Sequence, residues 1–171
     1  RVLAGDQEAV RLLLQILPQS QVGEREYPFQ LLGHSAFHTP LMASASQHGQ
    51  TALASLAWRP PEVPLVDGRG RIFDPRTTRV DDLADYTLRT QVLETYDFTA
   101  SVSVVLREFA PDALILLGPG DTLGGALGHI LIKERWQGLQ DKASFIARQK
   151  SDDPILCAMA RPEQWARVAR A

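Results

Sequence analysis

The sequence has little cysteine, no long apolar run and no excess charge of either sign. Cys157 is the single cysteine among 171 residues, so no intramolecular disulfide can form, and a cytoplasmic location is the simplest expectation. The longest apolar run, Ala113–Leu117, is far below the ~18 residues needed to cross a bilayer, so we expect no membrane partner. A net charge of -2 provides no basic field, and nucleic acid is therefore not an expected partner.

Motifs for metals, phosphates and nucleophiles are also missing. There is no C-x-x-C or H-E-x-x-H, and the four histidines lack ligand spacing, so no metal and no bound cofactor are expected. In the loop Gly118–Gly125, Leu123 replaces the third glycine of a dinucleotide fingerprint, which favours close strand–helix packing over anion binding. Ser35 lies in a Gly-His-Ser-Ala-Phe segment whose final Phe excludes a nucleophile elbow. The arginines of Arg69–Arg79 fit a solvated loop better than a contact with an acidic partner or a phosphate.

The residues that are present predict a globular α/β chain in which helices alternate with short strands. A composition of 44% hydrophobic and 22% charged residues lies near the globular average and excludes a disordered chain. The clearest helical periods are Val10 to Leu17, after the capping residue Asp6, and Phe98 to Phe109. Strands are expected at 2–4, 26–32, 63–66 and 113–117, the last buried on both faces, and further helices at 40–58, 81–90, 122–133 (capped by Asp121) and within 136–171.

The segment Ser35–Met42, with the sequence Ser-Ala-Phe-His-Thr-Pro-Leu-Met, resembles the active-site histidine motif of malonyl-CoA:acyl-carrier-protein transacylases. The same motif occurs in the acyltransferase domains of polyketide and fatty-acid synthases. Other pieces of the chain resemble the family in the same order, and together they cover about residues 1–133. These pieces are Val2–Gly5 with Gln7–Val10, Val63–Val66, Gln91–Leu93 leading to Phe98–Val102, and Leu117–Gly120 with Leu123–Gly124.

The resemblance implies a catalytic role for His38 and Gln91. His38 would be the general base that takes a proton from a serine and later returns it to the departing thiol. Gln91 matches the residue whose backbone carbonyl holds the imidazole in the useful tautomer, in place of a carboxylate. Phe37 and Met42 are the expected substrate-binding residues, and the bulk of Phe37 favours a malonyl group over a methylmalonyl group.

The resemblance also implies the architecture and the partners. We expect residues 1–34 to be half of a ferredoxin-like α+β subdomain. Residues 35–171 would be the C-terminal portion of a large α/β-hydrolase-like subdomain with a helical tail. The family's Gly-His-Ser-x-Gly elbow, its oxyanion-hole glutamine and its malonate-binding arginine are not found in this sequence. The chain is therefore expected to be the C-terminal part of a transacylase, with the serine elbow in a missing N-terminal portion.

Three functions stay open at this point. The first is an acyltransferase of fatty-acid or polyketide biosynthesis, which moves a malonyl group from CoA to the phosphopantetheine thiol of an acyl carrier protein. Its substrate would be a CoA thioester, and its partner the carrier protein. The second is an acyl hydrolase on the same scaffold, and the third is a non-catalytic module that binds carrier protein.

Overall fold

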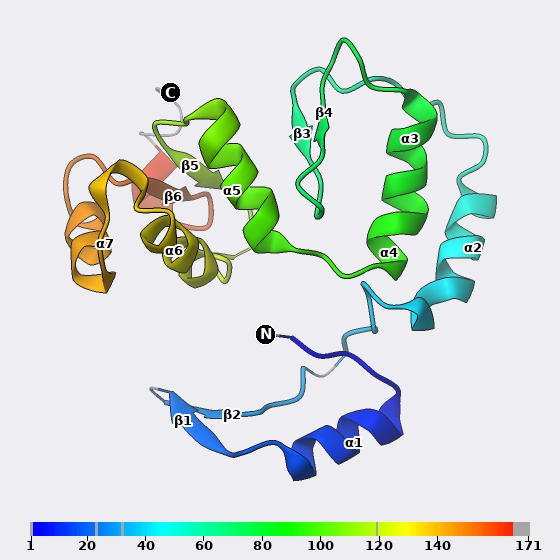
Figure 1. The fold of residues 1–171 in the computed structure, drawn as a ribbon, viewed down its shortest axis with the longest axis horizontal. Helices are drawn as coiled ribbons and strands as arrows, with labels where there is room; N and C mark the ends of the chain where they lie inside the picture. The colour runs from blue at the N-terminus through cyan, green and yellow to red at the C-terminus, as the bar shows by residue number, and fades with distance from the viewer. Residues whose placement is uncertain (1, 23, 32, 119, 166–171) are drawn as a thin grey trace. The chain divides into compact units, whose positions relative to one another are not determined.

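The computed structural model describes residues 2–22, 24–31, 33–118 and 120–165. The chain is a mixed α/β protein, mostly helical, with small sheets (Figure 1). Its contacts divide it into two compact units: unit 1 is Arg1–Leu65 with Phe73–Tyr96, and unit 2 is Val66–Ile72 with Asp97–Ala171. No helix in the described ranges is long and apolar enough to span a membrane. The assignment of 1–34 and 35–171 to ferredoxin-like and hydrolase-like subdomains stays a prediction.

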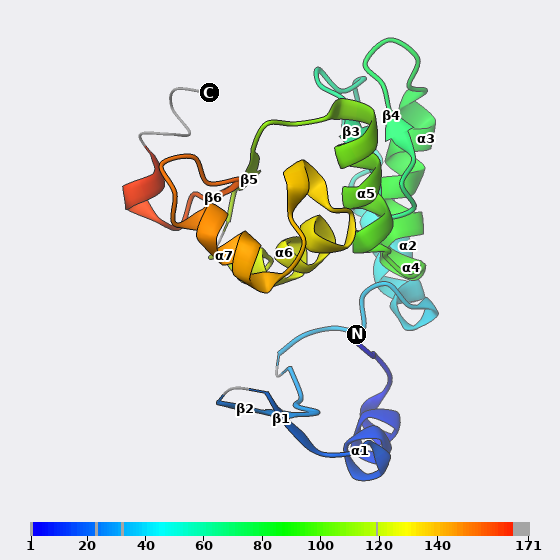
Figure 2. The same cartoon turned by 60° about the vertical axis from the view of Figure 1, so that its left-hand side comes forward.

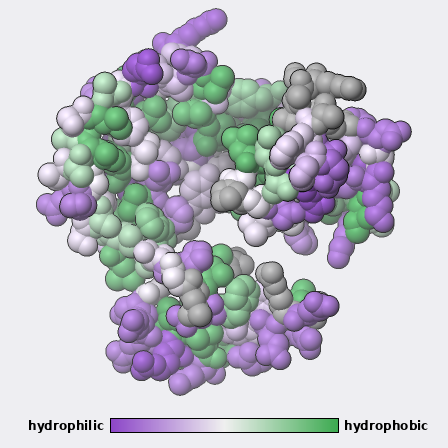
Figure 3. Space-filling model, turned by 180° about the vertical axis from the view of Figure 1, so that it is seen from behind, coloured by the Kyte–Doolittle hydropathy of each residue, from purple (hydrophilic) through white to green (hydrophobic). Residues whose placement is uncertain are grey.

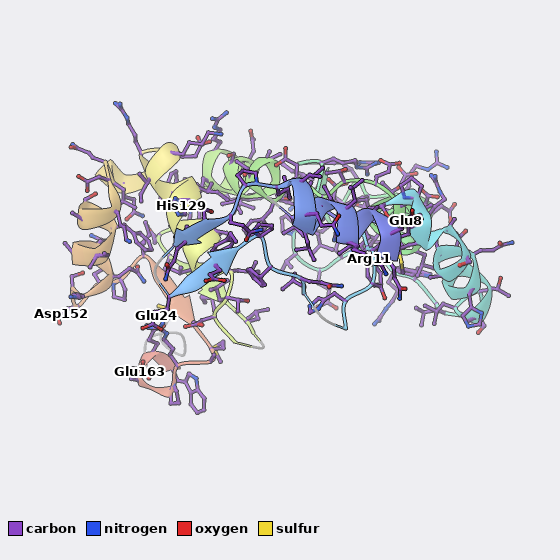
Figure 4. The ribbon with its side chains drawn as sticks, turned by 90° about the horizontal axis from the view of Figure 1, so that it is seen from below. Glu8, Arg11, Glu24, His129, Asp152 and Glu163 are labelled. Atoms are coloured by element: carbon purple, nitrogen blue, oxygen red, sulfur yellow. The ribbon has the colours of Figure 1, made fainter. Side chains whose placement is uncertain are left out.

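The first helix of unit 1, α1 (Gln7–Ile16), follows the apolar stripe that predicts it. The side chain of Asp6 accepts a hydrogen bond from the backbone N–H of Ala9 at 2.8 Å, which confirms the expected N-cap. The stripe residues of the prediction are the half-buried ones, whereas Glu8 and Arg11 extend into solvent (Figure 4). Sequence periodicity and capping therefore describe this helix well.

The strands around α1 differ from the prediction. Residues 2–4 form no strand; Val2 is 82% exposed, and no strand pairs with this segment within the described residues. After the helix, β1 (Ser20–Val22) pairs antiparallel with β2 (Arg25–Tyr27). The strand expected at 26–32 thus begins and ends earlier, and Pro28, which has no N–H to donate, follows its last residue. The order in this region is helix–hairpin rather than strand–helix–strand.

Two helical segments of unit 1 lie side by side (Figure 1). A 3-10 turn, η1 (Pro40–Met42), leads into α2 (Ala43–Ala52), which ends before the predicted limit near residue 58. Leu53 and Leu56, which follow it, are exposed and give no core to continue the helix against. The second segment is one continuous helix made of α3 (Val80–Asp85), the π-helical turn η2 (Tyr86–Thr90) and α4 (Gln91–Leu93). The prediction of a helix at 81–90 found this segment but not its π turn.

The core of unit 1 is small. Phe73, Leu83 and Tyr86 are buried together, with Trp58 packed against them, and the Phe73 and Tyr86 ring centroids are 5.8 Å apart. Phe73 ends the short strand β4 (Ile72–Phe73), which pairs with β3 (Leu65–Val66). Many large apolar side chains of this unit reach the surface, and Figure 3 shows apolar residues in green on the face it displays.

Unit 2 has the larger core, built between helices and a strand pair. The helix α5 (Phe98–Phe109) matches its predicted bounds, and α6 (Gly124–Lys133) and α7 (Lys142–Gln149) follow it. Parallel strands β5 (Leu114–Leu116) and β6 (Leu156–Ala158) lie side by side (Figure 2). Short 3-10 turns, η3 (Trp136–Gly138) and η4 (Pro162–Gln164), complete the unit. The buried cluster consists of Val102, Leu106, Leu127, Ile130, Leu131, Leu139, Ile155 and Leu156.

Three predictions for unit 2 are wrong. The strand at 113–117 is not buried on both faces, because Ile115 is 41% and Leu117 is 82% exposed. Asp121 does not cap α6; its carboxylate binds the guanidinium of Arg161 at 2.7 Å instead. The tail was predicted to contain helices within 136–171, but it also contains the strand β6, which the prediction did not include.

Side chains bond to the outer edge of β6. The side-chain amide of Gln149 donates to the carbonyl oxygen of Leu156 at 2.8 Å and accepts from its N–H at 3.0 Å. The side chain of Gln164 accepts from the N–H of Ala158 at 2.7 Å. Glutamine side chains therefore occupy the edge of β6 that faces away from β5.

Candidate functional site

His38 has an unusual backbone conformation. It lies in the loop before η1, and its φ of 66° is in the left-handed region, which is rare for a residue with a side chain. Thr39 must be extended because Pro40 follows it, and it is, at φ -140° and ψ 158°. Two hydrogen bonds hold the loop: the backbone N–H of His38 donates to the carbonyl oxygen of Val92 at 2.9 Å, and the Thr39 hydroxyl donates to that of Ala36 at 2.7 Å. The surrounding contacts thus maintain a conformation that histidine itself disfavours.

The imidazole of His38 is held by a hydrogen bond at one of its two ring nitrogens. Its Nδ1 lies 2.5 Å from the backbone carbonyl oxygen of Gln91. A carbonyl oxygen can only accept, so Nδ1 carries the hydrogen, and the neutral ring then has its lone pair on Nε2. His38 is among the exposed residues of the chain. The geometry is that of a ring held in one tautomer, with Nε2 as its proton acceptor.

Both contacts of His38 use the end of the helix α4. The last carbonyl groups of a helix have no partner within it and need one elsewhere. Here the Thr90 carbonyl accepts from the N–H of Glu94 at 2.9 Å, while the next two carbonyls, of Gln91 and Val92, accept from His38. A helix C-terminus therefore supplies two neighbouring acceptors to one residue that is distant in sequence.

Aromatic side chains flank the imidazole. The ring centroid of Phe37 is 6.4 Å from that of His38, and the centroid of Tyr96 is 5.4 Å from it, with the rings tilted by 47°. Phe37 is 51% exposed and Leu41 is 55% exposed, so apolar surface lies beside the histidine in sequence. Met42 belongs to η1 and is half buried. The structure thus brings His38 and Gln91 together and places Phe37 next to them; whether Phe37 and Met42 bind substrate stays a prediction.

Sequence reasoning missed Tyr96. It follows α4 by only three residues, but nothing in its neighbourhood of the sequence marks it as a partner of a histidine 58 positions earlier. Only the resemblance, which connects the region of Gln91 with His38, pointed to this part of the chain. Its ring lies next to the imidazole, at a centroid distance of 5.4 Å, so Tyr96 belongs to the surroundings of His38.

The other candidates of the sequence have structural roles or none. Ser35 is exposed and lies in an irregular segment rather than in a turn between a strand and a helix, in keeping with its rejection as a nucleophile. The buried carboxylate of Asp67 accepts from the backbone N–H groups of Arg69 and Arg71 at 2.8 and 2.9 Å, and the Arg69 guanidinium binds it at 2.7 Å. This part of the arginine-rich stretch therefore organises a turn.

The described residues provide no metal-binding cluster, and His38 does not line the surface hollow of unit 1. In the part of the chain that the structure describes, no group of three or more histidine, cysteine or acidic side chains could hold a metal ion. A surface hollow of about 340 Å³ does not include His38; it is lined by Leu56, Ala57, Trp58, Arg59, Pro60 and Glu62. On the same helical segment as Gln91, the hydrogen bond and charge of Asp85 raise the pKa of the Arg89 guanidinium.

Comparisons with known proteins add no relative. No protein-family model, no curated protein and no solved structure matches this chain. The chemistry of the site must therefore follow from its own geometry, namely an imidazole with a fixed tautomer and two aromatic rings near it.

Proposed function

We propose that this chain supplies the general-base histidine of an acyltransferase. The enzyme would move a malonyl or related acyl group from CoA to the phosphopantetheine thiol of an acyl carrier protein, through an acyl-serine intermediate. The observation that carries the proposal is the contact between His38 Nδ1 and the carbonyl oxygen of Gln91, at 2.5 Å. A neutral backbone acceptor holds the imidazole as a carboxylate does in a serine–histidine–aspartate triad.

The fixed tautomer suits both halves of such a reaction. In the first half, Nε2 of His38 takes the serine hydroxyl proton while the serine oxygen bonds to the thioester carbon; the CoA sulfur then leaves with that proton. In the second half, Nε2 takes the proton of the carrier thiol, whose sulfur bonds to the acyl carbon, and the serine oxygen leaves and is protonated again. No net proton is gained or lost over the cycle.

The serine is expected outside this sequence, in an N-terminal portion that carries the Gly-His-Ser-x-Gly elbow. Two apolar side chains close to His38 in the sequence, those of Phe37 and Leu41, are exposed. This exposed apolar surface supports the proposal that substrate or the serine-bearing portion covers it. The hydrogen bonds of His38 and Thr39 already hold the loop in this chain, so the base needs little reorganisation when such a partner binds.

The test uses the protein that contains both this chain and the serine-bearing portion, purified with any polypeptide that accompanies it. Denaturing mass spectrometry after incubation with malonyl-CoA should show one malonyl group on a serine, and added carrier protein should remove it. His38→Ala should slow acylation by at least about 100-fold, the lower range for loss of a general base. The control is His48→Ala, on the exposed side of α2.

Two outcomes would contradict the proposal. One is acylation of His38→Ala at the rate of the unaltered protein, and the other is the lack of any acylated polypeptide. Release of free malonate as the main product, with carrier protein left unmodified, would instead select the hydrolase. Carrier-protein binding without turnover, unchanged by His38→Ala, would select the non-catalytic module.

A further inference from the structure

The π-helical turn η2 exposes backbone carbonyls that side chains must satisfy. The N–H of Gln91 bonds back to the carbonyl of Tyr86, five residues earlier, so the usual ladder is interrupted here. Two carbonyls of the turn instead accept from side chains. The side-chain amide of Gln91 donates to the carbonyl oxygen of Thr87 at 2.9 Å. The hydroxyl of Ser46 donates to the carbonyl oxygen of Leu88 at 2.7 Å.

Ser46 is the member of this arrangement that comes from another helix. It lies on α2, is only 3% exposed, and also accepts a hydrogen bond from the side chain of Gln50 at 3.1 Å. Both capacities of the buried hydroxyl are thus used. A buried contact between helices could have been made by alanine alone, whereas the hydroxyl selects one carbonyl of the π turn and fixes where α2 lies along it.

His38 and Ser46 hold the same helix from one short stretch of chain. The backbone N–H of His38 bonds to Val92, its ring bonds to Gln91, and Ser46 bonds to Leu88. Leu88 and Val92 are four residues apart on one continuous helical segment, so both anchors are made within about one turn of it. Between the two anchors, η1 leads directly into α2 without an intervening loop, so the connection is helical.

We propose that Ser46 is a positioning residue for His38. Its hydrogen bond to Leu88 sets the position of α2 along the π turn, and through η1 this keeps Nδ1 on the carbonyl of Gln91. Without the hydroxyl, the anchor at Leu88 is lost, the loop can shift, and the ring is released from its single tautomer. The consequence for catalysis rests on the proposed function; the effect on the imidazole does not.

The test measures the His38 tautomer in the full chain by nitrogen NMR of ¹⁵N-histidine-labelled protein, at a pH where imidazoles are neutral. His38→Ala identifies the resonances. In the unaltered chain, the two ring nitrogens should show the well-separated shifts of a pure Nδ1–H form. In Ser46→Ala, these shifts should move toward the averaged values of an unrestrained ring, and Ser46→Thr, which keeps a hydroxyl, should restore them.

The matched control is Thr51→Ala. The Thr51 hydroxyl donates to the carbonyl of Gln47 at 3.0 Å, within α2 itself, so its removal deletes a similar bond without touching the π turn. His38 should keep its shifts in this variant. If Ser46→Ala does not fold, Ser46→Cys, a weaker donor of similar size, replaces it and should give intermediate shifts.

The inference is overturned if folded Ser46→Ala or Ser46→Cys keeps the pure Nδ1–H shifts, or if Thr51→Ala loses them equally. In the complete enzyme, Ser46→Ala should lower kcat for acyl transfer with little change in KM, because substrate contacts are retained. The two failures can be told apart. If the enzyme has no acyltransferase activity, Ser46→Ala should still change the His38 tautomer. If the enzyme is active but Ser46→Ala leaves the His38 shifts unchanged, only the positioning role of Ser46 is refuted.

Discussion

The residue that ends α5 allows a test of backbone conformation by one small change. Ala110 has φ 43° and ψ 54°, in the left-handed region, and its side chain is exposed. A residue with a Cβ costs about 1–2 kcal/mol in this conformation, whereas glycine adopts it freely. Glycine also gives the unfolded chain more freedom, which offsets roughly 0.4–1 kcal/mol. Ala110→Gly should therefore stabilise unit 2 by about 0.5–1 kcal/mol.

The same substitution within a helix should have the opposite sign. Ala147 is exposed and lies inside α7, where glycine costs about 1 kcal/mol relative to alanine. Neither side chain is buried, so packing contributes little to either result. The two variants should consequently differ by about 1.5–2 kcal/mol although the chemical change is identical.

Urea unfolding followed by circular dichroism measures both free energies of unfolding. The slope m should stay constant, since neither change alters the surface exposed on unfolding, and the midpoint should rise for Ala110→Gly and fall for Ala147→Gly. A thermal scan should show shifts of roughly 2–4 °C for each kcal/mol in a chain of this size. If Ala110→Gly lowered the midpoint as much as Ala147→Gly does, Ala110 would not be left-handed, and the reasoning would be refuted.

Two more predictions concern unit 2. Arg107 and Ser103 lower the pKa of Glu134 through hydrogen bonds at 2.8 Å, so this carboxylate stabilises the fold above its ordinary pKa of about 4.5 and stops doing so as the pH falls through the lowered value. Glu134→Gln should therefore be less stable than the unaltered chain at pH 7 and approach it in acid, when urea midpoints are compared from pH 7 to 3; a constant gap would contradict this. Leu131 is fully buried in the core, so Leu131→Ala should cost about 2–5 kcal/mol in the same assay, and a loss below about 1 kcal/mol would contradict its place there.

The parts of the fold that the sequence predicted are those governed by local rules. The helix α5 follows an apolar period of three to four residues, and Asp6 caps α1 by a hydrogen bond to a residue only three positions later. The parts it missed depend on contacts that are distant in sequence. Asp121 has the residue type of a cap, yet it pairs with Arg161, and the short apolar run of β6 becomes a strand only because β5 lies beside it.

The candidate site divides in the same way. His38 was found through a sequence resemblance, and its contact with the Gln91 carbonyl was expected from that resemblance. The π turn could not be read from the sequence, because an interrupted hydrogen-bond ladder leaves no periodic signature in so few residues. Tyr96 and Ser46 were missed because their roles depend on which helices pack together, and a buried serine looks in sequence like any other small helical residue.

The glutamine side chains on β6 make the small sheet of unit 2 directional. A side-chain amide has the same donor and acceptor as a peptide group, so Gln149 occupies the outer edge of β6 as one residue of a further strand would. On β5, Leu114 and Leu116 direct their peptide groups toward β6, and the peptide groups of Ile115 between them point the other way. A further strand would find the outer edge of β6 occupied at Leu156 and Ala158, so the edge of β5 is where we expect it to add.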